Sequence, residues 1–153
     1  MTTPDAADTD LDLVDADGHL VEHPFDLQRY APASHRDAVY HVEIDDDGEE
    51  WVVVGDQRIT ANVFTLTASA GFTEEDRIRS HKGELRFSEM TGGCWNVGPR
   101  LTDMDADGIS TSVLYPTLML TFQSQHPADL VVAQCQAYND WVTDHVAESR
   151  GRL

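Results

Sequence analysis

The chain contains very few cations. Lys82 is the only lysine, and ten Lys and Arg residues stand against 28 Asp and Glu residues, which gives a formal net charge of −18. A surface of this charge repels the phosphates of nucleic acids and of anionic lipids, and no basic run offsets it. We therefore expect neither nucleic acid nor a membrane among the partners.

Long apolar runs are also missing. The stretch from Val113 to Phe122 is interrupted by Pro116 and reaches about half of the roughly 20 residues that a membrane-spanning helix needs. The acidic start, Met1 to Asp12, lacks the basic-then-apolar order of a secretory signal. These absences favour a cytoplasmic location. The acidity fits either a high-salt cytoplasm or a GC-rich genome, and the sequence leaves both origins open.

Cysteine is equally scarce. Cys94 and Cys135 lie far apart and show no paired metal-ligand spacing, so the sequence predicts two free thiols rather than a disulfide framework or a zinc knuckle. Neither cysteine lies in a local nucleophile signature, and no serine lies in a nucleophile elbow. We assign no catalytic residue in this chain.

What is present is the composition of one globular domain. The chain has 153 residues, of which 41% are hydrophobic, and this length allows a core of useful size. Residues 1–10 form a predicted acidic, flexible tail, and residues 11–153 form the predicted domain.

The sequence predicts two strands and two helices that alternate along the chain. A short strand over 11–17 and a β-branched strand over 109–115 each lead to a turn, at Gly18 and Pro116. The second strand follows a short helix over 99–105, and a 3.6-residue apolar period marks a long helix over 127–147. This order indicates an α/β fold in which the two strands pair in parallel.

Two segments interrupt this order. Residues 38–63 predict an inserted antiparallel hairpin, because apolar and polar residues roughly alternate on both sides of a turn rich in Asp and Gly. Residues 67–98 show poor periodicity and predict a long excursion or a mobile lid.

Metal-binding side chains gather at the end of the first strand. Asp15, Asp17 and His19 alternate along it, with Glu22 and His23 close behind. Residues two apart point to the same side of a strand, so Asp17 and His19 could share one divalent cation such as zinc, manganese or iron. A solvated acidic turn is the alternative that spacing alone leaves open.

Two further patterns have plainer interpretations. The segment from Asp103 to Gly108 imitates half of a calcium-binding loop, but the twelfth position is Leu114 rather than Glu, so a helix end at Gly108 is favoured. Tyr115 and Thr117 lie at the end of the second strand, where ligand sites form in α/β folds. They are candidate substrate-binding residues, with a strand-ending turn as the alternative.

Three stretches together resemble one family. DADGHLVEHP from Asp15, RLTDMDADGISTSVLYPT from Arg100 and AYNDWVTDH from Ala137 are similar to the metal-dependent amidohydrolases related to aminocarboxymuconate semialdehyde decarboxylase. The resemblance implies a distorted (β/α)8 TIM barrel, one zinc or manganese ion, and hydrolysis or non-oxidative decarboxylation of a small carboxylic acid. It also implies that Asp17 and His19 replace the family's usual His-x-His ligand pair.

The length departs from this family. A complete barrel needs about 250 residues, and the resemblance accounts for two barrel strands out of eight. The family's other ligands, a His and an Asp, and its catalytic His have no counterpart. We expect an N-terminal fragment that is inactive alone and that self-associates or needs the missing C-terminal half. The alternative is a non-catalytic acidic interaction domain.

Overall fold

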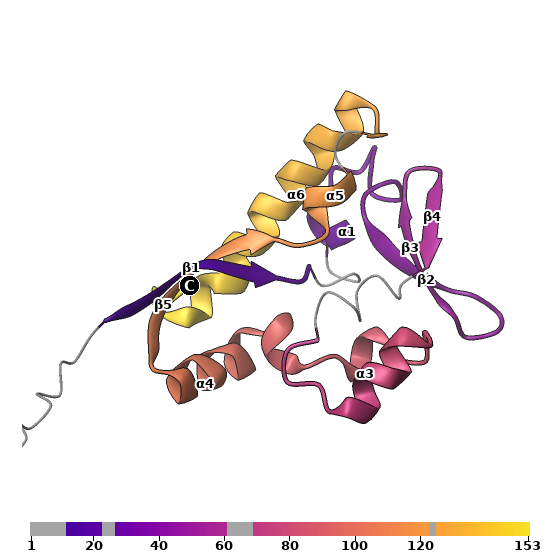
Figure 1. The fold of residues 1–153 in the computed structure, drawn as a ribbon. Helices are drawn as coiled ribbons and strands as arrows, with labels where there is room; N and C mark the ends of the chain where they lie inside the picture. Colours follow the sequence, from indigo (N-terminus) through magenta and orange to yellow (C-terminus); the bar gives the residue numbers. More distant parts are fainter. Residues whose placement is uncertain (1–11, 23–26, 61–68, 123–124) are drawn as a thin grey trace, which may run out of the picture.

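The computed structural model describes residues 12–22, 27–60, 69–122 and 125–153. Its fold is mixed α/β, with one parallel and one antiparallel sheet (Figure 1). The parallel sheet contains β1 (Leu13–Leu20) and β5 (Ile109–Pro116). The antiparallel sheet has the order β2 (His41–Ile44), β3 (Glu50–Val54) and β4 (Gln57–Thr60). The expected tail over 1–10 lies outside the described residues.

A helical crossover joins the two parallel strands. Helix α4 (Val97–Asp107) begins after Asn96, whose side chain accepts a hydrogen bond from the Gly98 N–H group. It ends at Gly108, which adopts a left-handed conformation with φ of 72°. Glycine is the residue that takes this conformation at least cost. The chain therefore turns directly into β5, as the sequence predicts.

The register of the parallel pair shifts twice. Asp15 pairs with Ser112 and Gly18 pairs with Leu114, so β1 carries one extra residue between these two pairs. An opposite shift places one extra residue in β5 near its start. The extra residue between Asp15 and Gly18 is a β-bulge, which changes the side to which the following residues point. The predicted strand end at Gly18 is wrong, because the strand resumes after the bulge and continues to Leu20.

The antiparallel sheet lies within the segment that predicts a hairpin. Asp45 orders its first turn by accepting hydrogen bonds from the N–H groups of Asp47 and Glu49 and from the indole N–H of Trp51. Arg58 on β4 lies over the Trp51 ring, 4.5 Å from its centroid. Cation–π and cross-strand contacts thus support the register of all three strands.

The excursion contains regular structure that the sequence interpretation missed. Helix α3 (Glu74–His81) begins with a capping box, in which Thr73 and Asp76 each bond the other's backbone N–H. Short 3-10 turns follow at Phe87–Glu89 and Gly92–Cys94. The capping box is visible in the sequence as Thr-x-x-Asp.

The longest helix covers much of the core. Helix α6 (Ala128–Val146) packs against α1 (Leu27–Tyr30). The short helix α5 (Met119–Phe122) connects β5 to α6 along the chain. The helix buries one apolar stripe together with the C-terminal end of β1 and the antiparallel sheet; this core includes Leu20, Val39, Tyr40, Val52, Leu130, Ala137 and Trp141. None of the described helices is long and apolar enough to cross a bilayer.

A buried carboxylate fixes the ends of the parallel strands. Glu22, just after β1, is fully buried and accepts hydrogen bonds from the backbone N–H groups of Thr117, Leu118 and Met119 at 3.0–3.2 Å. Burial raises the pKa of Glu22, and the three N–H groups offset part of that shift. The side chain therefore holds the turn after β5 against the end of β1.

We expect Glu22→Gln to destabilise the fold. An amide has one acceptor oxygen, so at least one buried N–H loses its partner, at a cost of about 1–3 kcal/mol in the free energy of unfolding. Urea denaturation of the wild type and the variant measures this difference. Glu84→Gln is the matched control, because Glu84 is exposed. Equal stabilities of the two variants would contradict the role of Glu22.

Candidate functional site

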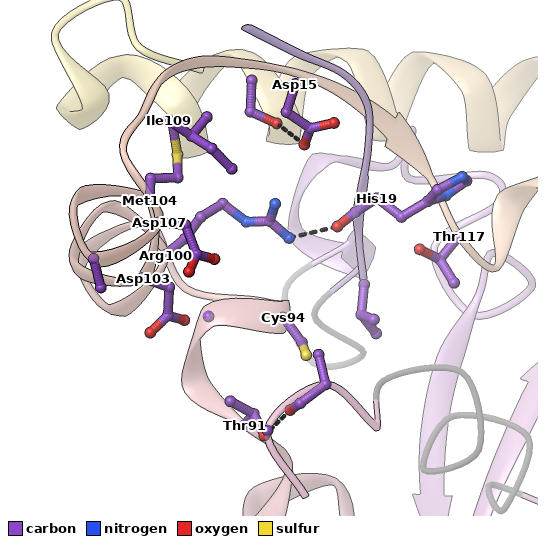
Figure 2. Close-up of a pocket in the computed structure, with 16 residues that line it drawn as sticks. Asp15, His19, Thr91, Cys94, Arg100, Asp103, Met104, Asp107, Ile109 and Thr117 are labelled. Carbon is purple, nitrogen blue, oxygen red and sulfur yellow. Dashed lines mark hydrogen bonds between the residues drawn. The ribbon is translucent and has the colours of Figure 1, made fainter. Parts of the chain in front are cut away.

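A cavity of about 500 Å³ lies beside β1 and α4 (Figure 2). Strand β1, helix α4, the start and end of β5, and segments near residues 70 and 93 contribute to its wall. Its polar lining includes Asp15, His19, Cys94, Arg100, Asp103 and Thr117. Volumes of this size are common for small-molecule sites.

Asp15 faces the neighbouring strand. Its carboxylate accepts hydrogen bonds from the Ser112 hydroxyl at 2.8 Å and from the Asp17 N–H at 3.1 Å. The Ser112 hydrogen bond is the largest cause that holds the pKa of Asp15 below its usual value. A Cβ at Gly18 would lie 2.3 Å from the Ser112 Oγ atom and 2.7 Å from the Asp15 Oδ2 atom, so a side chain there would displace this pair.

Asp17 and His19 lie together, as the sequence predicts, but Asp15 does not join them. The His19 Nε2 and Asp17 Oδ1 atoms are 4.0 Å apart, and the two side chains are 45% and 91% exposed. The expectation that all three side chains project together is wrong, because the β-bulge lies between Asp15 and Gly18. His23, the fifth member of the sequence cluster, lies outside the described residues.

The hydrogen bonding of His19 suits a metal ligand. Its Nδ1 atom lies 3.0 Å from the Pro116 carbonyl oxygen, which can only accept, so Nδ1 carries the proton and Nε2 keeps a lone pair. The 4.0 Å separation from Asp17 is close to twice a zinc–ligand bond of about 2.0–2.2 Å. The two atoms are therefore near enough to share a cation.

A complete metal centre is not formed within the part of the chain that the structure describes. No group of three or more His, Cys, Asp or Glu side chains there could hold an ion. Catalytic zinc sites use about three protein ligands. The Asp17–His19 pair thus fits a zinc or manganese ion in donor chemistry but not in ligand number.

Arg100 is a cavity residue that sequence analysis missed. Its Nη2 atom donates a hydrogen bond to the His19 carbonyl oxygen (Figure 2), across 81 positions in the chain. The Nε atom is buried and has no hydrogen-bond acceptor among the described residues. Burial lowers the pKa of Arg100. No local signal marks this arginine, because its position depends on the packing of α4 beside β1.

The two candidate substrate residues separate in the structure. Thr117 lines the cavity, and its hydroxyl donates to the Leu20 carbonyl oxygen at 3.0 Å. Tyr115 is not part of the cavity wall; it pairs with His19 in the register, with ring centroids 6.2 Å apart. A substrate-binding role remains a prediction for both residues.

One face of the parallel sheet is partly exposed in the described part of the chain. Val113 and Tyr115 on β5 are 45% and 44% exposed. Ser112, the residue before Val113 on the same strand, is buried. Asp17 and His19 are also exposed on the adjacent strand. Parallel strands are normally covered on both faces. The candidate ligands therefore lie at a sheet that other polypeptide would ordinarily cover.

Comparisons with known proteins support the fold. No family model and no curated protein matches the sequence. Among solved structures, an amidohydrolase of Mycobacterium avium subsp. paratuberculosis K-10 matches with a TM-score of 0.58 and 17% identity, over 87% of this chain. The chain spans 38% of that amidohydrolase. The described fold is therefore amidohydrolase-like.

We expect Ser112→Ala to raise the pKa of Asp15. The variant removes the largest cause of its depression, and NMR titration of the carboxyl carbon measures the change. A depressed carboxyl pKa contributes stability above the unfolded-state value and loses it as the pH falls. The stability difference between wild type and variant should therefore shrink in acid.

Ser110→Ala is the matched control for this titration. Its hydroxyl bonds the Leu13 carbonyl on the same strand pair and does not touch Asp15. An unchanged Asp15 pKa in the Ser112 variant would show that the hydroxyl does not set it.

Proposed function

We propose that this chain supplies the first two β/α units of an amidohydrolase-like (β/α)8 barrel, in which Asp17 and His19 are two ligands of a zinc or manganese ion. The observation that carries this proposal is the Asp17–His19 pair on β1, the strand that pairs in parallel with β5. The Asp17 Oδ1 and His19 Nε2 atoms of this pair are 4.0 Å apart. The family resemblance and the amidohydrolase neighbour support it.

The bound metal would polarise a substrate oxygen or lower the pKa of a water toward about 7. The reaction is hydrolysis or non-oxidative decarboxylation of a small carboxylic acid in the cytoplasm. Within this chain, His19 presents Nε2 because Pro116 holds Nδ1. Asp17 adds the negative charge that balances part of the cation. Thr117 and Tyr115 flank this pair as candidate substrate contacts.

The complete enzyme needs more than this chain. By the family resemblance, a further His and Asp ligand and the catalytic His would come from the other β/α units of the barrel. Two ligands hold a catalytic metal poorly. The chain alone is accordingly proposed to be inactive.

We expect weak zinc or manganese binding that depends on Asp17 and His19. Isothermal titration of the metal-free chain should show a weak site in the wild type, and this site should disappear in His19→Ala and in Asp17→Asn. His81→Ala is the control, since His81 is exposed on α3. Equal metal binding in wild type and His19→Ala would overturn the ligand assignment.

A non-catalytic interaction domain is the second candidate function. The observation that favours it is the uncovered face around Val113 and Tyr115. Exposed apolar groups on a parallel sheet favour association. In this case the chain would assemble with a partner chain or with itself.

We expect the purified chain to self-associate through this face. Sedimentation velocity in about 1 M salt, where the Debye length falls to about 3 Å, keeps the net charge of −18 from hiding the contact. The double variant Val113→Thr with Tyr115→Ser should shift the chain toward monomer. Ile78→Thr is the control, because Ile78 is an exposed apolar residue on α3. A monodisperse wild-type monomer would contradict self-association.

A further inference from the structure

A second cavity lies between helix α6 and the turn around His35. Its volume is about 440 Å³, and it shares no lining residue with the cavity beside β1 and α4. Ser34, His35 and Asp129 are among its lining residues. These are the three residue types of the nucleophilic triad, which occurs on unrelated folds and in different chain orders. Geometry therefore decides whether they can act together.

The three side chains are linked by hydrogen bonds. The Ser34 Oγ and His35 Nδ1 atoms are 2.9 Å apart, and the His35 Nε2 and Asp129 Oδ2 atoms are 3.4 Å apart. An ionised carboxylate can only accept, so Nε2 carries the proton and Nδ1 accepts the hydrogen bond from the Ser34 hydroxyl. A histidine withdraws a proton from a serine in this direction.

The contact between His35 and Asp129 is long but effective. It exceeds the usual range of about 2.7–3.2 Å, and such bonds tighten in many sites when substrate binds. The His35 hydrogen bond is the largest cause that holds the pKa of Asp129 below its usual value. The carboxylate is therefore ionised at neutral pH and able to orient the imidazole.

Backbone hydrogen bonds fix the turn that carries the serine and the histidine. The His35 N–H group donates to the Pro32 carbonyl oxygen at 2.9 Å, and the His35 carbonyl accepts from the N–H groups of Ala38 and Val39 at the same distance. Val39 is fully buried in the core. The two side chains are thus presented to α6 by an ordered backbone, as a reactive site requires.

Helix α6 restricts what the cavity can accept. Its lining residues there are spaced three or four apart and share one side of the helix; they include Asp129, Val132, Ala133 and Gln136. Val132 is exposed and gives an apolar wall, whereas Asp129 repels anions. The Gln136 amide is a candidate donor to a developing oxyanion. The cavity therefore suits a neutral ligand with a short apolar group.

We propose that Ser34, His35 and Asp129 form a second reactive site, which cleaves neutral carboxylic esters with a short apolar acyl group. Ser34 is the nucleophile, His35 is the general base and acid, and Asp129 is the positioning residue that orients the imidazole. The site includes neither Asp17 nor His19, so it stands independently of the proposed function.

The reaction needs only water as a co-reactant. The Ser34 Oγ atom bonds to the ester carbonyl carbon while its proton passes to His35 Nδ1. The ester C–O bond then breaks, and the departing alcohol takes that proton. Water next attacks the acyl group and gives a proton to Nδ1. The bond between the acyl carbon and Oγ breaks, and Oγ recovers the proton as the acid leaves.

Hydrolysis of p-nitrophenyl butyrate tests the activity. We would follow p-nitrophenol release by the full chain with a chelator present. Ser34→Ala and His35→Gln should each lose at least about tenfold of the rate above background, because a positioned base contributes about 10²–10⁴-fold. Ser88→Ala is the control, since Ser88 is exposed and lies outside the cavity. No release above background, or equal rates in wild type and Ser34→Ala, would overturn the proposal.

A charged acyl group tests the restriction by the wall. The p-nitrophenyl monoester of glutaric acid, whose acyl group is anionic, should react more slowly than the butyrate because of Asp129 and the net charge of −18. Equal or faster cleavage of the anionic ester would refute the selectivity for neutral esters.

Covalent labelling identifies the nucleophile without any variant. A fluorophosphonate probe bonds through phosphorus to an activated serine oxygen and loses fluoride, and peptide mass spectrometry should place the label on Ser34. Lys82 and Cys135 are exposed competing nucleophiles. A label on these residues alone, or none on Ser34, would contradict the assignment.

Asp129→Asn tests the positioning role. The variant removes the charge that stabilises the imidazolium in the transition state, so kcat should fall while KM stays the same. Asp140→Asn is the control, because Asp140 is exposed on the same helix and outside the cavity. An unchanged kcat in Asp129→Asn would refute this role.

Discussion

The parallel pairing of β1 with β5 is the contact on which the rest of the structure depends. Side chains reinforce it along its length: Ser110 bonds the Leu13 carbonyl, Ser112 bonds Asp15, and Thr117 bonds the Leu20 carbonyl. Glu22 completes the set by holding the turn after β5. These links join segments 95 to 97 residues apart. The cavity and the candidate metal pair both lie along this pair of strands, so both depend on its register.

The β-bulge in β1 decides which chemistry each acidic residue can perform. Without the extra residue, Asp15 would share a side with Asp17 and His19 and three donors would face one cation. With it, Asp15 turns to Ser112 and the cavity, and only two donors remain together. Gly18 makes this arrangement possible, because a side chain there would clash with Ser112 and Asp15. The extra residue therefore places Asp15 on the cavity wall and leaves Asp17 and His19 together as a partial metal site.

Local signals explain what the sequence could predict. The apolar period of α6, the Gly108 helix end and the Asp-rich turn at Asp45 each act over a few residues, and the corresponding elements form. The capping box at Thr73 was equally local and could have revealed α3. Arg100 and the bulge could not be found this way. The first depends on packing across 81 positions, and the second on a register that alternation alone does not encode.

His19 links the candidate metal pair to the cavity through different atoms. Its imidazole is fixed by the Pro116 carbonyl, and its own carbonyl accepts the Arg100 hydrogen bond. In a parallel ladder, a residue directs both backbone groups to the same neighbouring side, so a carbonyl bonded to Arg100 lies at the edge of β1 away from β5. The Val21 N–H, two residues on, likewise bonds the Cys94 carbonyl at this edge. Side-chain and loop contacts thus occupy the outer edge of β1 near the candidate ligands, and they hold His19 in place before any metal ion binds.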